Sequence, residues 1–202
     1  MTLPPIALPH KYRIKVDKPR LRVFGGALGE DSGVPVQHID RLGTRFAIDV
    51  TIPVMRTEPH GRIWSSRLCQ AKLRGAILRY NQDGFAVGSP GDPVVDGAGQ
   101  SGMSLAMRNF TPHYAVREGQ AFNLVHAGRN YLHFAAAPAA ADASGKLTLT
   151  LYPMLRVIPD DGDALNFRKP VIEGSISGNE ASWTRLTAPF CDFGTITISE
   201  DE

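Results

Sequence analysis

The 202-residue sequence predicts a mostly β fold with a single α-helix. Apolar and polar residues alternate with a period of two through most of the chain, as in strands that bury one face. Only residues 58–75 space their apolar side chains at helical intervals. The connections between these segments are rich in Gly, Pro, Ala and Asp, as in residues 84–93 and 135–145.

Two early segments predict strands. In "KYRIKVDKPRLR" (11–22) the charges alternate with Tyr12, Ile14 and Val16, which favours a strand with one solvated face over a stripe that follows nucleic-acid phosphates. The segment "RFAIDVTIPV" (45–54) predicts a half-buried strand. Its apolar face comprises Phe46, Ile48, Val50, Ile52 and Val54, and its other face comprises Arg45, Ala47, Asp49 and Thr51.

The predicted helix is "EPHGRIWSSRLCQAKLRG" (58–75), in which Trp64, Leu68 and Ala71 share one side. Pro59 suits the first turn of a helix and Gly75 suits its end. We expect Trp64 and Leu68 to anchor the helix on an adjacent sheet, above one or more of the residues Phe46, Ile48 and Val50.

The segment "GAGQSG" (97–102) matches G-x-G-x-x-G, the pattern of loops that bind a dinucleotide pyrophosphate. That function needs a strand before the loop and a helix after it. The upstream "GDPVVD" (91–96) offers little for a buried parallel strand, and the downstream "MSLAMRNF" (103–110) alternates as a strand. We therefore interpret the segment as a strand-connecting loop whose glycines, Gly97, Gly99 and Gly102, supply backbone freedom.

The second half of the chain predicts further strands. "AFNLVH" (121–126) and "YLHFAA" (131–136) form a hairpin across "AGRN", where Gly128 and Asn130 can take positive φ. "KLTLTLY" (146–152) directs Leu147, Leu149 and Leu151 inward and Lys146, Thr148, Thr150 and Tyr152 outward. "CDFGTITIS" (191–199) is expected as a last strand, with Ile196 and Ile198 on one side.

Composition excludes few classes of protein. Lys and Arg (22) exceed Asp and Glu (20) by two, so the overall charge calls for neither nucleic acid nor an anionic membrane. Cys69 and Cys191 are far apart, which favours buried free thiols in a reduced compartment over a disulfide. The N-terminus lacks a charged leader followed by an apolar run, and no segment approaches 18 apolar residues. We expect a soluble protein made in a cytoplasm.

The sequence predicts no catalytic, cofactor-binding or metal site. His126 and His133 have no Cys, Asp or Glu at ligand spacing, and neither H-E-x-x-H nor C-x-x-C occurs. The nucleophile motif G-x-S-x-G is also absent, and nothing near Cys191 marks it as activated. The acidic "DDGD" (160–163) lacks the ligands of a complete calcium loop, which favours a solvated turn.

From Trp64 onward, the order of these signals resembles the distal tail protein of long-tailed bacteriophages. The similar segments are "RGAILRY", "GSPGDPVVDGAGQSG", "REGQAFNLVHAGRNYLHF" and "ADASGKLTLTLYPMLR". In such proteins a "GQ" turn introduces a strand of the type Phe122–Val125, and a "D-x-x-G" turn leads to a strand that ends in "YP" plus a leucine. The corresponding residues here are Asp142, Gly145, Tyr152, Pro153 and Leu155.

The resemblance implies a β-sandwich or split-barrel domain with one flanking helix, built from residues 1–79 and 155–202, and an inserted small OB-like β-barrel at residues 80–154. It also implies a structural, non-enzymatic virion protein that needs no cofactor. Six copies would form a ring at the distal end of the tail, joining the tail tube protein to the tip or baseplate hub proteins and leaving a channel through which DNA passes without specific binding. No membrane partner is implied.

Two alternatives stay open. The chain could be a small β-barrel enzyme or ligand-binding protein with a pocket in the loops around Gly97 and His126. It could also be a carbohydrate-binding module, because OB-like barrels bind oligosaccharides on faces with exposed aromatic residues. Tyr131, Phe134 and Tyr152 are the candidates for such a face, although we assign them first to packing.

Overall fold

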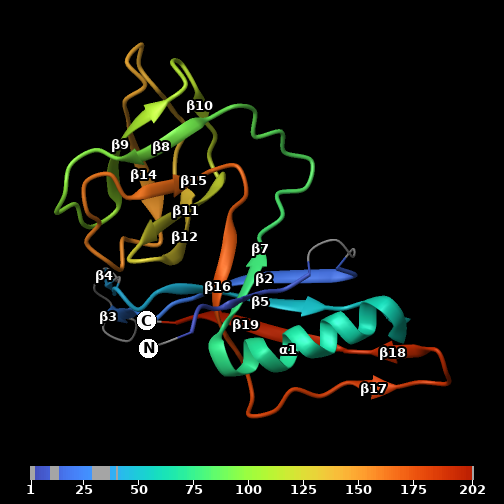
Figure 1. Cartoon of the computed structure of the whole chain (residues 1–202). Coiled ribbons are helices and arrows are strands. Elements are labelled where there is room, and N and C mark those ends of the chain that lie inside the picture. Colours follow the sequence, from blue (N-terminus) through green and yellow to red (C-terminus); the bar gives the residue numbers. More distant parts are fainter. Residues whose placement is uncertain (1–2, 10–13, 29–36, 40, 202) are drawn as a thin grey trace. The chain divides into compact units, whose positions relative to one another are not determined.

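The computed structural model describes residues 3–9, 14–28, 37–39 and 41–201 (Figure 1). The predicted fold class is confirmed: the described chain is mostly β, with one α-helix and a closed β-barrel. It divides into two compact units. The first comprises the chain as far as Arg20, Phe46–Tyr80 and the chain from Val171 on, and the second comprises Leu21–Arg45 and Asn81–Pro170.

The first unit contains most of a six-stranded sheet in the order β1-β7-β16-β19-β5-β2; Leu21, Arg22 and Arg45, at the ends of β2 and β5, are grouped with the second unit. Its strands are β1 (Ile6–Ala7), β2 (Val16–Arg22), β5 (Arg45–Thr51), β7 (Ala76–Arg79), β16 (Val171–Ile176) and β19 (Thr195–Glu200). β1 and β7 are parallel, whereas β7, β16, β19 and β5 pair antiparallel in succession. The sheet is thus assembled from segments far apart in the sequence.

A small three-stranded sheet in the order β17-β18-β6 accompanies it. Its strands are β6 (Met55–Arg56), β17 (Thr184–Arg185) and β18 (Phe190–Asp192). The segment 191–199, expected as one strand, is therefore divided between β18 and β19. Gly194, at φ 63°, marks the break between them.

Helix α1 spans Arg62–Arg74 and follows a single π-helical turn, η1 (Thr57–Gly61). The predicted face is confirmed, because Trp64, Leu68 and Ala71 are all buried. The helix begins later than expected because Glu58 is extended, at φ −112° and ψ 138°. It ends as predicted at Gly75, at φ 89°.

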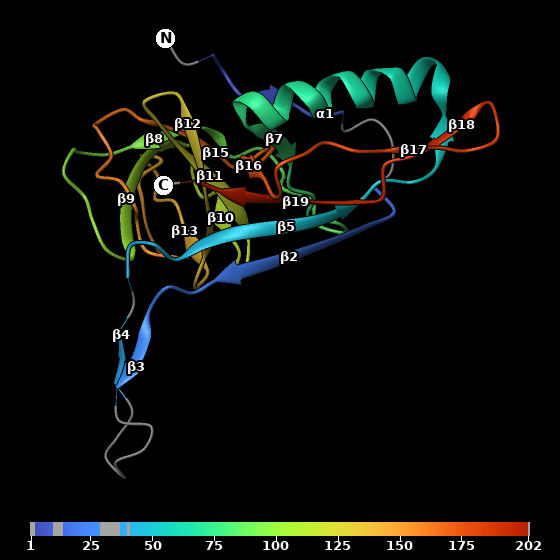
Figure 2. The same cartoon turned by 90° about the horizontal axis from the view of Figure 1, so that it is seen from below.

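The helix lies along one face of the sheet (Figure 2) and contacts β1 and β16. The Trp64 ring lies 6.2 Å from that of Phe193, centroid to centroid. At the end of the helix the Lys72 ammonium donates to the carbonyl oxygens of Ile176 (2.7 Å), Ser177 (3.0 Å) and Gly178. These charge-assisted bonds join the helix to the chain that leaves β16.

The predicted alternation of β5 is largely confirmed. Phe46, Ile48, Val50 and Ile52 are buried, but Val54 lies beyond the strand and is 52% exposed. Ala47, assigned to the polar face, is also buried. This second buried position shows that β5 is covered on both faces at that point.

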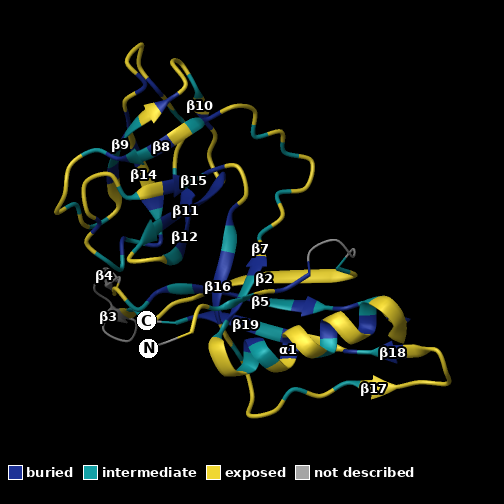
Figure 3. Cartoon of the chain, viewed as in Figure 1, coloured by how far each residue is buried: buried dark blue, intermediate teal, exposed yellow. Residues whose placement is uncertain are grey.

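Within the part of residues 11–22 that the structure describes, the predicted strand is confirmed as β2, but the expectation that one of its faces is buried was wrong. All seven residues of β2 are exposed, so the strand has no buried face (Figure 3). β2 lies at the edge of the sheet, with a hydrogen-bonded neighbour on one side only, and its exposure shows that no described element covers either of its faces. Arg20 donates to Asp49 on β5 at 2.6 Å. Tyr12 lies outside the described residues.

The second unit contains a closed barrel in the order β11-β12-β14-β9-β8-β15. Its strands are β8 (Gly91–Val95), β9 (Ser104–Phe110), β11 (Ala121–His126), β12 (Arg129–Ala135), β14 (Leu147–Tyr152) and β15 (Ala164–Asn166). Two short antiparallel pairs complete the unit: β10 (Ala115–Val116) with β13 (Ala139–Ala140), and β3 (Gly26–Leu28) with β4 (Gln37–Ile39).

The barrel interior is mostly apolar. Leu147, Leu149 and Leu151 are buried, as the alternation of β14 predicts. The rings of Phe122 and Phe167 stack at 4.6 Å between centroids. Because the strands close on one another, the barrel leaves no edge of its sheet unpaired.

The predicted hairpin is confirmed, with a shorter connection than expected. β11 and β12 are joined by Ala127 and Gly128, at φ 49° and 78°. Positive φ at both central residues is the geometry that matches the twist of antiparallel strands. Asn130, expected in the turn, lies in β12 instead.

The barrel unit runs further than the expected boundary at residue 154. β15 pairs with both β11 and β8 and so completes the barrel, and the compact unit extends to Pro170. Residues Leu21–Arg45, expected in the other domain, are grouped with it.

Replacing Leu68 by Ala should lower the free energy of unfolding by about 2–5 kcal/mol, because the side chain is 1% exposed and leaves a cavity. Leu73 on the same helix is 85% exposed, so Leu73→Ala is the matched control and should change stability by less than about 0.5 kcal/mol. Urea unfolding of both variants measures this; equal effects would contradict the assigned face.

Gly174→Ala should destabilise the sheet by about 3 kcal/mol or more, since an added Cβ would overlap the carbonyl of Ser199 on the adjacent strand. Gly26→Ala is the control, because nothing lies within 4 Å of a Cβ there. Chemical unfolding measures the loss of unfolding free energy in each variant. Equal losses would show that β16 and β19 are not paired closely enough at Gly174 to exclude a Cβ.

Candidate functional site

The "GAGQSG" loop connects β8 to β9 in the barrel. Gly97, Gly99 and Gly102 all have positive φ, between 79° and 94°, which confirms the need for glycine. The downstream strand is confirmed too. The upstream segment forms the short strand β8, which is antiparallel to β9 rather than the parallel strand of a dinucleotide site, and no helix follows the loop.

The Gln100 side chain fills the inside of this loop. Its Nε2 donates to the carbonyl oxygens of Asp96 (3.0 Å), Gly97 (2.9 Å) and Ala106 (3.1 Å), and its Oε1 accepts from the Ala106 N–H at 2.6 Å. A dinucleotide site binds phosphate through the N–H groups of its loop, but here the Gly97 N–H donates to Asp161 at 2.8 Å and the Gly99 N–H donates to the Pro159 carbonyl at 3.2 Å. The loop is therefore closed on itself.

A charged network joins the loop to the turn at residues 160–163. Arg108 on β9 donates to Asp96 at 3.0 Å and to both carboxylate oxygens of Asp161, one of them at 3.1 Å. Lys146 donates to Asp96 at 2.9 Å, and the Gly97 N–H donates to Asp161 at 2.8 Å.

These bonds favour the charged carboxylates. Hydrogen bonds from Lys146 and Arg108 lower the pKa of Asp96, and hydrogen bonds from Arg108 and the Gly97 N–H lower the pKa of Asp161 to about 2. An open depression of about 330 Å³ lies beside the network, lined by Asp96, Asp142 and Lys146 among others. Arg108 and Lys146 neutralise these acids. We therefore interpret the network as a structural feature that holds the loop after β8 against the turn at residues 160–163.

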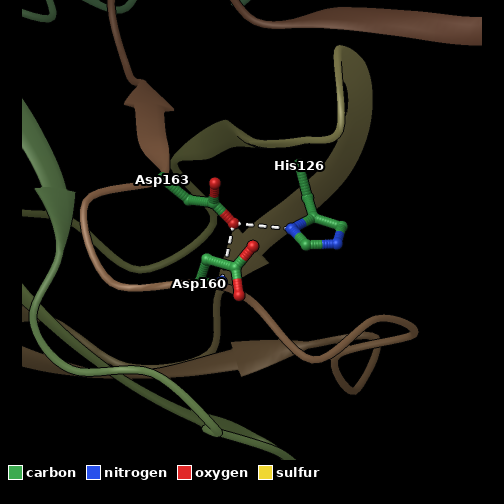
Figure 4. Close-up of side chains that lie close together, drawn as sticks. All are labelled: His126, Asp160 and Asp163. Carbon is green, nitrogen blue, oxygen red and sulfur yellow. Dashed lines mark hydrogen bonds and ion pairs between the residues drawn. The ribbon is translucent and has the colours of Figure 1, made fainter.

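A second cluster combines His126, Asp160 and Asp163 (Figure 4). Its register follows from the barrel: Val125 on β11 pairs with Ala164 on β15, so the next residue on each strand, His126 and Asp163, meet. Nδ1 of His126 lies 2.7 Å from Oδ2 of Asp163. The Asp160 N–H donates to the same oxygen at 2.9 Å.

One ligand-type atom from each of these three side chains lies within 4.8 Å of the others. Nothing in the sequence relates His126 to "DDGD" (160–163). They are 34 to 37 residues apart, and the short β15 that aligns them has no clear period of its own. Only the barrel register could have revealed the pairing.

His133, the other histidine of the hairpin, lies in the interior. Its Nδ1–H donates to the carbonyl oxygen of Pro153 at 2.9 Å, and its Nε2 is buried with no hydrogen-bond partner among the described residues. Burial lowers the pKa of His133 to about 4, and the positive charge of Arg156 acts in the same direction. The side chain is neutral at pH 7 and packs 6.0 Å from the Phe122 ring.

Both cysteines are free thiols, as expected, but only Cys191 is buried; Cys69 is exposed. Burial raises the pKa of the Cys191 thiol, which opposes its use as a nucleophile. Its sulfur faces the Met55 carbonyl oxygen at 3.5 Å.

The three aromatic candidates for a carbohydrate face are engaged in packing. Tyr131 and Phe134 are each 8% exposed, and Phe134 stacks on Tyr152 at 5.5 Å between centroids. The guanidinium of Arg156 lies 5.2 Å from the centre of the Tyr131 ring. These residues thus offer little open ring surface to a sugar.

Among the described residues, no helix has both the length and the apolar character needed to cross a bilayer. Comparison of the sequence with models of known protein families and with curated proteins finds no match.

His133 should make the fold sensitive to acid. Its folded pKa of about 4 lies below the unfolded value of 6.5, so the unfolded chain takes up a proton first as the pH falls. Between pH 6.5 and 4 this costs about 3 kcal/mol of stability. His133→Gln keeps a donor for Pro153 but cannot titrate. Urea unfolding across this range should show a smaller loss for the variant; parallel losses would contradict the assignment.

Proposed function

We propose that the protein is a structural subunit of a phage tail, which forms a ring at the distal end of the tail. In this role the ring joins the tail tube to the tip or baseplate proteins and leaves a central channel for DNA. The ring would be hexameric, as the resemblance to distal tail proteins implies. The protein then acts through its surfaces and needs neither catalysis nor a cofactor.

Chain organisation supports the proposal. Both ends of the chain contribute to one β-sheet unit with a single helix, and most of the barrel unit is inserted between β7 and β16. This is the order of elements that the resemblance implies. Fold alone does not define function, so the surfaces must show whether the chain can assemble.

The observation that carries the proposal is the exposed edge strand β2. Its seven residues bury no side chain, including Val16 (53% exposed) and Leu21 (42% exposed). The chain that follows exposes Val23 and Phe24 as well. β2 buries almost no side-chain surface against its own sheet. It also presents apolar side chains, and on the side away from β5 its backbone groups have no strand neighbour among the described residues. Such a strand suits contact with another chain.

A repeated contact of this kind closes into a ring when each subunit presents the edge to a different surface of the next. Pro19 lacks an N–H and limits strand pairing at the middle of β2. We therefore expect side chains as well as backbone to form the interface.

The alternative of a ligand-binding barrel has less support. The "GAGQSG" loop is filled by Gln100, and the candidate aromatic residues pack against their neighbours. Neither feature gives a ligand an open surface of the expected kind.

Sedimentation and native mass measurement of the purified chain test the proposal, with negative-stain images of any large species. We expect a ring of six copies that persists at about 1 M salt, where the Debye length is about 3 Å, since Val16, Leu21 and backbone groups would carry the contact while the charged side chains of β2 stay solvated. A chain that stays monomeric at every concentration, or a ring that dissociates as salt rises, would contradict it.

Leu21→Asp should prevent assembly without unfolding the chain, because it places a charge on the exposed edge. Leu73→Asp on the exposed side of α1 is the matched control and should assemble as the unmodified chain does. Equal assembly of the two variants would show that β2 is not part of the interface.

A further inference from the structure

We propose that His126, Asp160 and Asp163 form a binding site for a divalent transition-metal ion at one end of the barrel, with Zn²⁺ as the representative ion. This inference is independent of the ring proposal, because it concerns side chains of the barrel alone. It rests on the position of the three groups, on their charge and on their donor chemistry.

The position is fixed by backbone pairing. His126 is the last residue of β11, and Asp163 immediately precedes β15, its neighbour in the barrel. The turn that carries both acids is closed by the Asp163 N–H, which donates to the Asp160 carbonyl at 3.2 Å, and by the Gly162 N–H, which donates to the Val95 carbonyl at 3.1 Å. The ligand atoms are thus held close together before any ion binds.

The charge of the cluster is not balanced by the protein. Asp163 is 17% exposed and His126 23% exposed. The neighbouring Asp161 pairs with Arg108, but no described Lys or Arg side chain pairs with Asp160 or Asp163. No hydrogen bond from another described residue reaches the Asp160 carboxylate. Two adjacent carboxylates with a single histidine partner favour a cation between them.

The donor set combines one imidazole nitrogen with two carboxylate oxygens. Ca²⁺ and Mg²⁺ prefer oxygen alone, whereas an imidazole suits Zn²⁺ and its neighbours in the first transition series. Zinc bonds of about 2.0–2.2 Å in a tetrahedron place two ligands roughly 3.4 Å apart. Nδ1 of His126 and Oδ2 of Asp163, at 2.7 Å, need only a small separation to reach this spacing.

Binding would replace the hydrogen bond between these two atoms. Nδ1 must offer its lone pair to the ion, so the imidazole proton then resides on Nε2. Solvent would supply any remaining ligand, because Asp160 is exposed. Such a site joins the β11–β12 hairpin to the turn before β15, and so stabilises the end of the barrel where its shortest strand closes it.

Calorimetric titration of the full chain with ZnCl₂ near pH 7.5 tests the proposal. Every protein in the test carries Cys69→Ser, because Cys69 is an exposed free thiol and a thiolate can itself bind zinc. We expect one Zn²⁺ per chain and weaker binding of Mg²⁺ and Ca²⁺. Loss even of an outer-shell partner weakens metal sites by about 10- to 100-fold, so Asp160→Asn and His126→Gln should each weaken Zn²⁺ binding by at least about tenfold.

Asp92→Asn is the matched control, since it removes one charge from an exposed position of the same barrel outside the cluster. It should bind Zn²⁺ as the parent does. Asp160→Asn removes an exposed carboxylate without a protein partner, so it remains decisive if His126→Gln fails to fold. Absence of saturable binding in the parent, or unchanged affinity in Asp160→Asn, would overturn the proposal.

Discussion

Backbone hydrogen bonding at the edges of β-sheets is the constraint on which this structure depends. Each strand offers N–H and C=O groups on two sides, and a protein of this class must close its sheets, cover their edges or offer them to another chain. The two units meet this requirement differently. In the barrel, β15 pairs with both β8 and β11 and closes the ring of strands. The six-stranded sheet has β1 and β2 at its edges, and among the described residues each of them has a strand neighbour on one side only.

Closure of the barrel also determines which charged side chains meet at one end of it. β15 is only three residues long, yet its register brings the turn at residues 160–163 against both β11 and the loop after β8. The turn therefore carries two kinds of contact: Asp161 is neutralised by Arg108, whereas Asp160 and Asp163 face His126 without a Lys or Arg partner among the described residues. Ionic interactions thus reinforce the shortest strand of the barrel.

Much of the fold could be predicted from local sequence, because period and turn chemistry act over a few residues. The spacing of Trp64, Leu68 and Ala71 identified the buried face of the helix, and the alternation of residues 147–151 identified the interior of β14. The predicted start of the helix was wrong, because Glu58 adopts an extended conformation that the helix propensities of the residues do not reveal.

The remaining features depend on contacts between distant segments. A period of two in residues 11–22 indicates a strand but does not say whether other parts of the chain cover either face of that strand. The barrel boundary was missed because β15, the segment "ALN", is too short to show a period. The clustering of His126 with Asp163 was missed for the same reason, since only the pairing of β11 with β15 brings them together.

The central claim is that the single chain leaves β2 incomplete and that another copy covers it. Amide hydrogen exchange of Val16–Arg22, compared between dilute monomer and assembled protein, tests this most directly. The account predicts fast exchange in the monomer at the amides that do not face β5, and protection of the same amides in the assembly. Amides that are already protected in the monomer, or that exchange as fast after assembly as before, would contradict it.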